Sequence, residues 1–301
     1  MVWKAHVQTT HDIQHTHTQN TNTVAIDHGV FNEDRFLDGI EDMGEVLQKV
    51  VAAQPDAVQV TIGQARSLHN GSTCVPQGGR MPALVIRTDV ANIYGNKKPQ
   101  IPFCDLQHPD IVLQALQMDA CGVICNLFML PDDAEGAGEL HRKCIQNVTH
   151  LRSECSKYGM VLLVEPLAFK WADPEKKDKF TMNNNVAVTR PLVRLACELG
   201  ADVIKCDLPD NIQEFSKLLH VCMPRPVLLR GGEKGEEAEV LKYAQDLIQV
   251  LSFPCFTGTK VQILTQLLQA GASGLVYGRN IIHHEDPTYI TRKFMEKVHA
   301  A

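Results

Sequence analysis

The chain has 301 residues, of which 44% are apolar and 21% charged, and its formal net charge is −6. This composition is typical of a soluble globular protein with a large core, and the acidic balance argues against a nucleic-acid or anionic-membrane partner. No apolar run approaches the roughly 18 to 20 residues that a membrane-spanning helix needs. Residues 1–22 are polar and lack both the apolar core of a secretory signal and the arginines of a transit peptide, so we expect a polar N-terminal tail and a cytoplasmic protein.

Eight short apolar runs, rich in Val, Ile and Leu, alternate with amphipathic stretches along the chain. Continuous apolar runs are typical of strands that are buried on both faces. The predicted strands are Thr23–Ile26, Ala57–Ile62, Ala83–Arg87, Gly122–Leu127, Met160–Glu165, Asp202–Cys206, Pro226–Leu229 and Gly274–Tyr277.

Helical patterns separate these strands. Apolar residues recur at three- and four-residue steps from Phe36 to Val50, which predicts a helix with one buried face. Similar patterns cover Pro109–Met118, Glu135–Tyr158, Val186–Leu199, Ile212–Val221, Glu236–Leu251, Thr259–Ala270 and Pro287–Val298.

Eight strands with intervening helices and no break in composition predict an α/β protein with a single (β/α)8 TIM barrel over residues 23–301. A doubly wound open sheet is the alternative, but the residues that follow the first strand, Asp27-His28-Gly29, are not the glycine-rich fingerprint it would carry. The longest irregular segment is Lys170–Asn185, after the fifth strand. Either a lid over the catalytic face or an ordinary solvated insertion fits it.

Ten cysteines are scattered along the chain, and no two of them form a CxxC pair. We therefore expect buried, reduced thiols, and neither a disulfide framework nor a structural zinc site. The histidines of the N-terminal tail have irregular spacing, so we expect a mobile tail and no metal site there.

A barrel enzyme draws its catalytic groups from the carboxyl ends of its strands. Lys205 ends the sixth predicted strand among aliphatic neighbours, where a lysine is expected to have a lowered pKa and to supply a free amine that attacks a carbonyl. Strand parity allows Glu165, at the end of strand five, to point into the same mouth. A purely structural pairing of Lys205 with Asp27 or Glu165 is the alternative.

Glycines follow the last two predicted strands, which is where barrels bind phosphate. Gly231 and Gly232 come after strand seven, and Gly278 and Arg279 come after strand eight. Glycines let backbone N–H groups approach an anion, and Arg279 can add a charged contact. The pair of loops therefore predicts a phosphate site.

Two further arginines end predicted strands, Arg87 on strand three and Arg230 on strand seven. They suit a second charged end of the substrate, such as a second phosphate or a sulfonate. Salt bridges to Asp89 or Glu233 are the alternative.

Taken together, these segments resemble the Schiff-base aldolase family, which includes deoxyribose-phosphate, archaeal-type class I fructose-bisphosphate and tagatose-bisphosphate aldolases. The resemblance covers residues 24–298 and is strongest around Lys205 and Arg279. It implies that Lys205 forms a Schiff base with a ketose, that Asp27 lies beside it and that the glycine loops bind a substrate phosphate. It also implies no cofactor, since the covalent imine with Lys205 supplies the chemistry. The segments that carry it are Asp27-His28-Gly29, residues 194–205, Gly231-Gly232 and residues 271–281.

One element departs from the family pattern. Archaeal-type fructose-bisphosphate aldolases carry Tyr-Pro-Arg-Gly after strand five, and the Tyr moves protons, whereas this chain reads Glu165-Pro166-Leu167-Ala168. Glu165 is therefore our candidate acid/base. This stretch and residues 205–209 look closer to the tagatose-bisphosphate and sulfofructose-phosphate aldolase branch.

The resulting hypothesis is a class I aldolase that cleaves a phosphorylated ketose to dihydroxyacetone phosphate and an aldehyde through Lys205, with Glu165 and Asp27 in the mechanism. The alternatives are a catalytically silent regulatory barrel that binds a sugar phosphate, and a transferase or thiolase-like barrel that uses the same lysine and phosphate site. The expected partner is a small-molecule sugar phosphate. The sequence leaves open which ketose it is and whether the chain forms a homo-oligomer.

Overall fold

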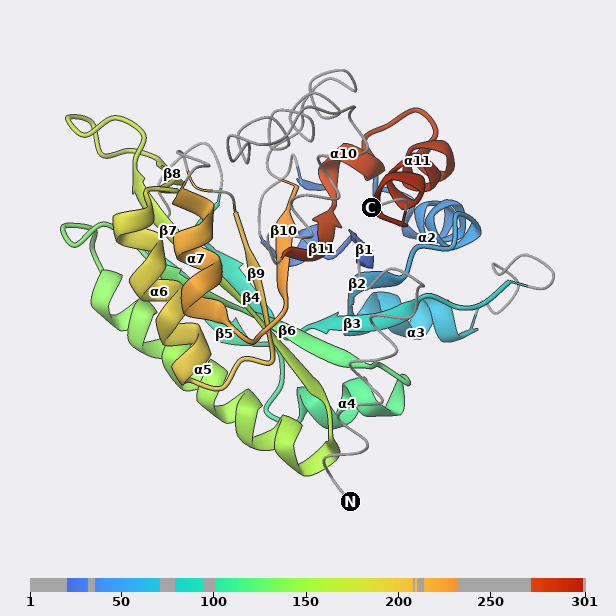
Figure 1. The fold of residues 1–301 in the computed structure, drawn as a ribbon, viewed down its shortest axis with the longest axis horizontal. Coiled ribbons are helices and arrows are strands. Elements are labelled where there is room, and N and C mark those ends of the chain that lie inside the picture. The colour runs from blue at the N-terminus through green and yellow to red at the C-terminus, as the bar shows by residue number, and fades with distance from the viewer. Residues whose placement is uncertain are drawn as a thin grey trace.

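Eight parallel strands form a closed barrel in a computed structural model of the chain, which describes residues 21–31, 36–70, 79–94, 101–207, 209, 214–231 and 272–299 (Figure 1). The strands pair with their neighbours in chain order, and the last pairs with the first, with Thr23 opposite Val276. The strands are β1 (Thr21–Ala25), β2 (Ala57–Thr61), β3 (Ala83–Arg87), β6 (Gly122–Met129), β7 (Val161–Trp171), β9 (Val203–Cys206), β10 (Val227–Arg230) and β11 (Ala272–Tyr277).

This arrangement confirms the predicted TIM barrel and all eight predicted strands. The first strand begins at Thr21, two residues earlier than expected, so Thr21 and Asn22 belong to the barrel and not to the tail. Residues 1–20, with the predicted tail, lie outside the described residues, as do the predicted helices Glu236–Leu251 and Thr259–Ala270.

Helices cover the outside of the barrel (Figure 1). Helix α2 begins at Met43 and not near Phe36, because the Asp42 carboxylate accepts the backbone N–H of Glu45 and caps the first turn there. Helix α3 directly follows β2 and was not predicted. The helices are α2 (Met43–Ala52), α3 (Ile62–Asn70), α4 (Ile111–Gln117), α5 (Ala137–Tyr158), α6 (Val186–Glu198), α7 (Phe215–Cys222), α10 (Arg279–Ile282) and α11 (Pro287–His299), with a 3₁₀ turn η1 (His28–Phe31).

Two hairpins extend the carboxyl side of the barrel. Strands β4 (Asp89–Asn92) and β5 (Phe103–Leu106), which were not predicted, pair antiparallel after β3. Strand β8 (Phe180–Met182) pairs antiparallel with the end of β7, where Trp171 stacks on Phe180 with ring centroids 4.6 Å apart. The prediction of an irregular Lys170–Asn185 segment is therefore wrong at both strands of this hairpin.

The described part of the chain contains eight cysteines, all buried and free, as expected, while Cys74 and Cys255 lie outside it. None of the helices described there is long and apolar enough to cross a membrane.

Side chains that point into the barrel form one apolar layer. Successive residues of a strand face opposite sides, so the residue two positions further along faces the same interior. The layer consists of Ala25, Ala57, Val85, Cys121, Ile124, Val161, Leu163, Val203, Leu228 and Val276. For eight of these residues, we can read off the residue that follows two positions later in the sequence. In chain order, these following residues are Asp27, Gln59, Arg87, Asn126, Glu165, Lys205, Arg230 and Gly278. The fold thus places a polar layer directly above an apolar one, at the carboxyl mouth of the barrel.

Candidate active site

Lys205 lies in this polar layer on β9 and is 4% exposed. Its Nζ donates to Gln59 Oε1 and to Glu165 Oε2, each at 3.2 Å. Burial lowers the pKa of Lys205, and Arg87 and Arg230 act in the same direction, while Glu165 and Asp27 oppose them. The net shift is downward, so a larger share of the amine is neutral near pH 7 than for an exposed lysine.

Gln59 links Lys205 to Asp27. Its Nε2 donates to Asp27 Oδ2 at 2.6 Å, while its Oε1 accepts from Lys205, so both ends of the amide are committed and its orientation is fixed. The sequence analysis missed Gln59. The available signal was a polar residue in the middle of an apolar strand, Ala57-Val58-Gln59-Val60, which is costly to bury without partners.

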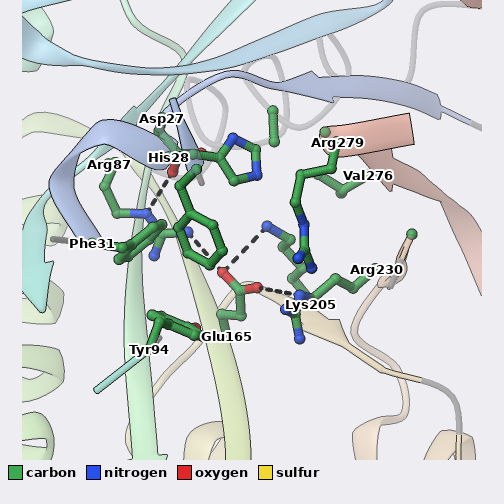
Figure 2. A pocket seen from close by; sticks show the side chains of 14 residues that line it. Asp27, His28, Phe31, Arg87, Tyr94, Glu165, Lys205, Arg230, Val276 and Arg279 are labelled. Carbon is green, nitrogen blue, oxygen red and sulfur yellow. Dashed lines mark hydrogen bonds and ion pairs between the residues drawn. The ribbon is translucent and has the colours of Figure 1, made fainter. Parts of the chain in front are cut away.

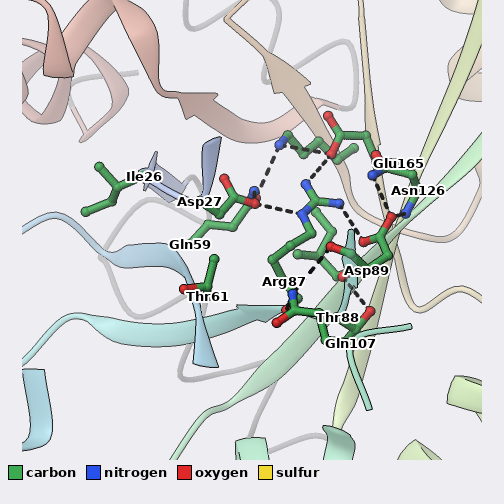
Figure 3. A network of polar contacts seen from close by, with 12 residues as sticks. Ile26, Asp27, Gln59, Thr61, Arg87, Thr88, Asp89, Gln107, Asn126 and Glu165 are labelled. Atoms are coloured by element: carbon green, nitrogen blue, oxygen red, sulfur yellow. Dashed lines mark hydrogen bonds and ion pairs between the residues drawn. The ribbon is translucent and has the colours of Figure 1, made fainter. Parts of the chain in front are cut away.

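Asp27 and Glu165 are both buried and both held by Arg87 (Figure 3). Arg87 Nε lies 2.7 Å from Asp27 Oδ2, and its Nη2 lies 2.7 Å from Glu165 Oε2. Burial alone would raise the pKa of Asp27, but the charges of Arg87, His28 and Lys205 together outweigh burial and lower the pKa to about 2. The pKa of Glu165 is also lowered to about 2, because Lys205, Arg87 and Arg230 together outweigh its burial. Both carboxylates are therefore ionised at neutral pH.

Arg87 is 1% exposed and engages a third carboxylate, with Nη1 3.3 Å from Asp89 Oδ1. Asp89 is itself fixed, since its Oδ2 accepts from the backbone N–H of Asn126 at 3.0 Å and from Asn126 Nδ2 at 2.6 Å. The sequence suggested either a substrate contact or a salt bridge for Arg87. The structure contains the salt bridge to Asp89, and the other nitrogens of Arg87 contact Asp27 and Glu165.

Arg230 stands at the edge of the same network. Its Nη1 lies 2.7 Å from Asp207 Oδ2, and its Nε lies 3.5 Å from Glu165 Oε1. Burial raises the pKa of Asp207, and Arg230 opposes that shift. Glu233, the alternative partner considered for Arg230, lies outside the described residues, as does Gly232.

The two glycines that the structure describes in the predicted phosphate loops both lie where a side chain would collide. A Cβ on Gly278 would come within 2.4 Å of the His28 ring, and a Cβ on Gly231 within 2.3 Å of the Tyr277 ring. Asn280 Nδ2 donates to the Gly231 carbonyl at 2.9 Å, which ties the two loops together. Packing thus accounts for glycine at both positions, and the backbone of each also lines the pocket described next.

A pocket of about 490 Å³, including its open mouth, lies above these groups (Figure 2). The predicted residues at its surface are Asp27, Arg87, Glu165, Lys205, Arg230, Gly231, Gly278 and Arg279. The structure therefore brings together at one mouth every predicted site residue that it describes.

Six lining residues were not predicted as site residues, namely Ala25, His28, Phe31, Phe36, Tyr94 and Val276. His28 follows Asp27, and burial lowers its pKa to about 4. Tyr94 follows β4, and burial raises its pKa above the ordinary value, so the phenol is protonated at neutral pH. The Tyr94 phenol, which comes from the segment after β4, thus lines the pocket, although the chain lacks a tyrosine directly after the fifth barrel strand.

A buried lysine with a lowered pKa, set beside ionised carboxylates at the carboxyl mouth of a parallel barrel, defines the class of enzymes that form a Schiff base with a carbonyl substrate. The model of the DeoC/LacD aldolase family matches residues 21–284. The chain belongs to this family and is therefore an aldolase, a carbon–carbon lyase.

Individual relatives agree with this assignment. The chain is 26% identical to an uncharacterized aldolase of Saccharolobus solfataricus, and 22% identical to the class 1 fructose-bisphosphate aldolase of Thermoproteus tenax. Both alignments cover 92% of this chain and 88% of the relative. Among solved structures, an archaeal fructose 1,6-bisphosphate aldolase superposes with a TM-score of 0.71 at 18% identity, over 98% of this chain and 100% of the other, which supports the fold.

Proposed function

We propose that the protein is a class I aldolase that cleaves a phosphorylated ketose to dihydroxyacetone phosphate and an aldehyde, with Lys205 as the residue that forms the imine. The observation that carries the proposal is the position of the Lys205 amine, buried at the floor of the pocket and 3.2 Å from Glu165. A ketose carbonyl above this amine would meet both a nucleophile and an adjacent proton acceptor.

Imine formation begins with transfer of one Lys205 proton to Glu165. The neutral amine adds to the ketose carbonyl at C2, and protonated Glu165 returns its proton to the departing hydroxyl, which leaves as water. The ammonium and carbonyl are thereby converted to an iminium and one water molecule, and Glu165 is again a carboxylate. Asp27 is about as acidic as Glu165 and is linked to Lys205 through Gln59, so its negative charge favours the positive iminium.

Cleavage follows when Glu165 accepts the proton of the C4 hydroxyl. The C3–C4 bond breaks, its electron pair passes into the iminium to give a neutral enamine, and the aldehyde leaves. A carboxylate with a pKa of about 2 is a weak base, so electron withdrawal by the iminium must supply much of the driving force. The same acidity lets protonated Glu165 deliver the proton readily to C3, after which water hydrolyses the iminium to dihydroxyacetone phosphate and Lys205.

The phosphate at C1 is assigned to Arg279, Gly278 and Gly231. All three line the pocket, where Gly231 directly follows β10 and Gly278 and Arg279 directly follow β11. Figure 2 shows Arg279 near Arg230. Arg87 is the poorer candidate, because its guanidinium already serves three carboxylates. Glycine backbones and an arginine at one pocket wall are a common way to hold a phosphate in a barrel.

Borohydride trapping tests the proposal. Incubation with dihydroxyacetone phosphate followed by reduction should add one reduced triose phosphate to the peptide that carries Lys205, and Lys205→Ala should abolish both the adduct and turnover. Lys143→Ala, at a lysine whose side chain is 46% exposed, is the matched control and should behave as wild type. Unmodified wild-type protein, or full turnover by Lys205→Ala, would overturn the Schiff-base proposal. An adduct without cleavage of any ketose phosphate would instead favour the silent regulatory barrel.

A further inference from the structure

Most polar side chains around the Lys205 amine are already bonded to other protein groups. Arg87 contacts three carboxylates and Arg230 contacts two, while both ends of the Gln59 amide are engaged. Tyr94 differs from them. It lines the pocket, and its hydroxyl has no hydrogen-bond partner among the residues that the structure describes. This phenol is therefore available to a bound ligand.

Four phenylalanine rings hold the ring of Tyr94 in place. Its centroid lies 5.2 Å from that of Phe31 and 5.4 Å from that of Phe36. It also lies 6.1 Å from the ring of Phe128, on β6, and 6.0 Å from that of Phe169, on β7. Because these contacts fix the ring, a hydrogen bond from its hydroxyl to a ligand costs little conformational entropy.

The two carboxylate oxygens of Glu165 have different surroundings. Oε2 lies 2.7 Å from Arg87 Nη2 and 3.2 Å from Lys205 Nζ. Oε1 has a longer contact, 3.5 Å to Arg230 Nε, and no other partner within the described ranges. Oε1 is therefore the oxygen better placed to accept the proton of the C4 hydroxyl, and the C4 oxygen of the substrate lies beside it in the proposed mechanism.

Tyr94 belongs to the same part of the pocket as Glu165 and Arg230. Burial raises the pKa of the phenol and keeps it protonated at neutral pH. Arg230 and Glu165 are the two charges that act on it most strongly, the first lowering its pKa and the second raising it. In Figure 2, Tyr94 lies below Phe31 and next to Glu165. A protonated phenol in this position has one hydrogen to donate to a group that contacts Glu165.

Resting on the proposed function, we infer that Tyr94 is a further catalytic residue, whose hydroxyl donates a hydrogen bond to the substrate oxygen on C4. In cleavage, the C4 hydroxyl gives its proton to Glu165 as the C3–C4 bond breaks, and negative charge develops on the C4 oxygen until its double bond to carbon is complete. A fixed donor stabilises that charge where it appears. The phenol keeps its own proton, so it is unchanged after each turnover. In the synthetic direction the same hydrogen bond polarises the aldehyde for attack by the enamine.

Tyr94→Phe tests the inference, because it removes the hydroxyl and keeps the packed ring. Two reactions of dihydroxyacetone phosphate involve no C4 atom, namely borohydride trapping on Lys205 and exchange of the C3 hydrogens with deuterated water, followed by NMR. The third reaction is cleavage of whichever ketose the wild type turns over fastest among fructose 1-phosphate, fructose 1,6-bisphosphate, tagatose 1,6-bisphosphate and sulfofructose 1-phosphate. In Tyr94→Phe, trapping and exchange should stay within about twofold of wild type, whereas kcat for cleavage should fall by about 100-fold.

Two further variants complete the test. Tyr158→Phe removes the same group from a tyrosine that is 37% exposed at the end of α5, and all three rates should match wild type. Glu165→Gln should slow exchange as well as cleavage, since Glu165 carries the C3 proton in the proposed mechanism. Cleavage at the wild-type rate in Tyr94→Phe would overturn the inference, and so would an equal fall in exchange and cleavage. A wild type that forms no adduct, or cleaves none of these ketoses, would overturn the proposed function and the inference with it.

Discussion

Arg87 and Lys205 share one acceptor: Glu165 Oε2 lies 2.7 Å from Arg87 Nη2 and 3.2 Å from Lys205 Nζ. A single carboxylate oxygen therefore fixes both the arginine that organises the site and the amine that we propose as the nucleophile. Because Arg87 stays with Glu165 whether or not Lys205 is protonated, the carboxylate is held in place while the amine changes charge. The predictions below separate the contributions of these three side chains.

The pH dependence of imine formation reports on the Lys205 amine. The rate of borohydride trapping should rise with pH through a midpoint below 10.5, because burial and the two neighbouring arginines lower the pKa of Lys205. In Glu165→Gln the midpoint should move to still lower pH, since the negative charge that favours the ammonium is gone. Asp105→Asn removes an exposed carboxylate and should leave the midpoint where it is. A shift to higher pH in Glu165→Gln would contradict the assigned electrostatics.

Turnover should respond to Glu165 differently from trapping. Glu165→Gln keeps the shape of the side chain but cannot accept the C4 proton, so kcat for cleavage should fall by about 10² to 10⁴. The adduct with dihydroxyacetone phosphate should form more slowly, because Glu165 also carries the Lys205 proton during imine formation, but it should still accumulate, since adduct formation does not break the C3–C4 bond. Steady-state cleavage and mass spectrometry of the reduced adduct measure the two steps separately. An unchanged cleavage rate would remove Glu165 from the mechanism.

Arg87 acts in our account as a positioning residue. Arg87→Lys keeps the charge but replaces a planar fork by a point donor, which cannot hold Asp27, Asp89 and Glu165 at once. We expect kcat to fall by about 100-fold while KM changes by less than about threefold, because displaced carboxylates slow the chemistry without removing a substrate contact. A large rise in KM at unchanged kcat would show instead that Arg87 binds a charged end of the substrate. Arg194→Lys, at an exposed arginine, is the control.

Loss of the Arg87 charge should be visible in stability as well as in activity. Arg87→Ala would leave three buried carboxylates without their shared cation, and breaking a buried ion pair on one side costs about 3 to 5 kcal/mol. Urea unfolding at pH 7 should therefore show a free energy of unfolding lower by about that amount. A variant as stable as wild type would mean that other groups neutralise Asp27, Asp89 and Glu165.

The sequence predicted the strands well because burial on both faces leaves a simple mark, a continuous apolar run. Lys205 stood out for the same reason, as a charge at the end of such a run, and parity placed Glu165 beside it. Gln59 carried the same kind of signal inside β2 and could have been found. The polar layer above the apolar barrel interior was thus largely encoded in local pattern.

The sequence named Glu165 as a possible partner of Lys205 and Asp89 as a possible partner of Arg87, but the rest of the network could not be predicted in the same way. The set of carboxylates that Arg87 contacts depends on closure of the barrel and on Asn126, which fixes Asp89. The Asn126–Asp89 and Arg87–Glu165 contacts join residues that are 37 or more positions apart in the sequence. Phe31 and Tyr94 were missed because Phe31 belongs to a 3₁₀ turn and Tyr94 lies two residues beyond the short strand β4, where no periodicity marks a buried face. Tertiary contacts alone bring these rings together.

Acid should destabilise the protein in two stages, because the pKa values of three buried groups, His28, Glu165 and Asp27, are lowered to between about 2 and about 4. The pKa of His28 falls from 6.5 to about 4, so the neutral imidazole favours folding fully above pH 6.5, and this contribution is lost as the pH drops toward 4. The pKa values of Glu165 and Asp27 fall from 4.5 and 3.8 to about 2, so their contributions are complete above about pH 4.5 and are lost below it. All three groups therefore act in the same direction as the pH falls.

The two stages can be separated with one variant. In His28→Gln the fall in Tm between pH 7 and pH 4.5 should be smaller than in wild type, because the side chain no longer gains a charge on unfolding. Below pH 4.5 the fall should lie closer to wild type, since Glu165 is unchanged, while Asp27 loses only the His28 charge that helps to lower its pKa. His108→Gln, at a histidine whose side chain is 51% exposed, should follow the wild-type curve throughout. A His28→Gln curve parallel to wild type between pH 7 and 4.5 would show that His28 does not titrate on unfolding, and the stability lost in that range would have to come from other groups.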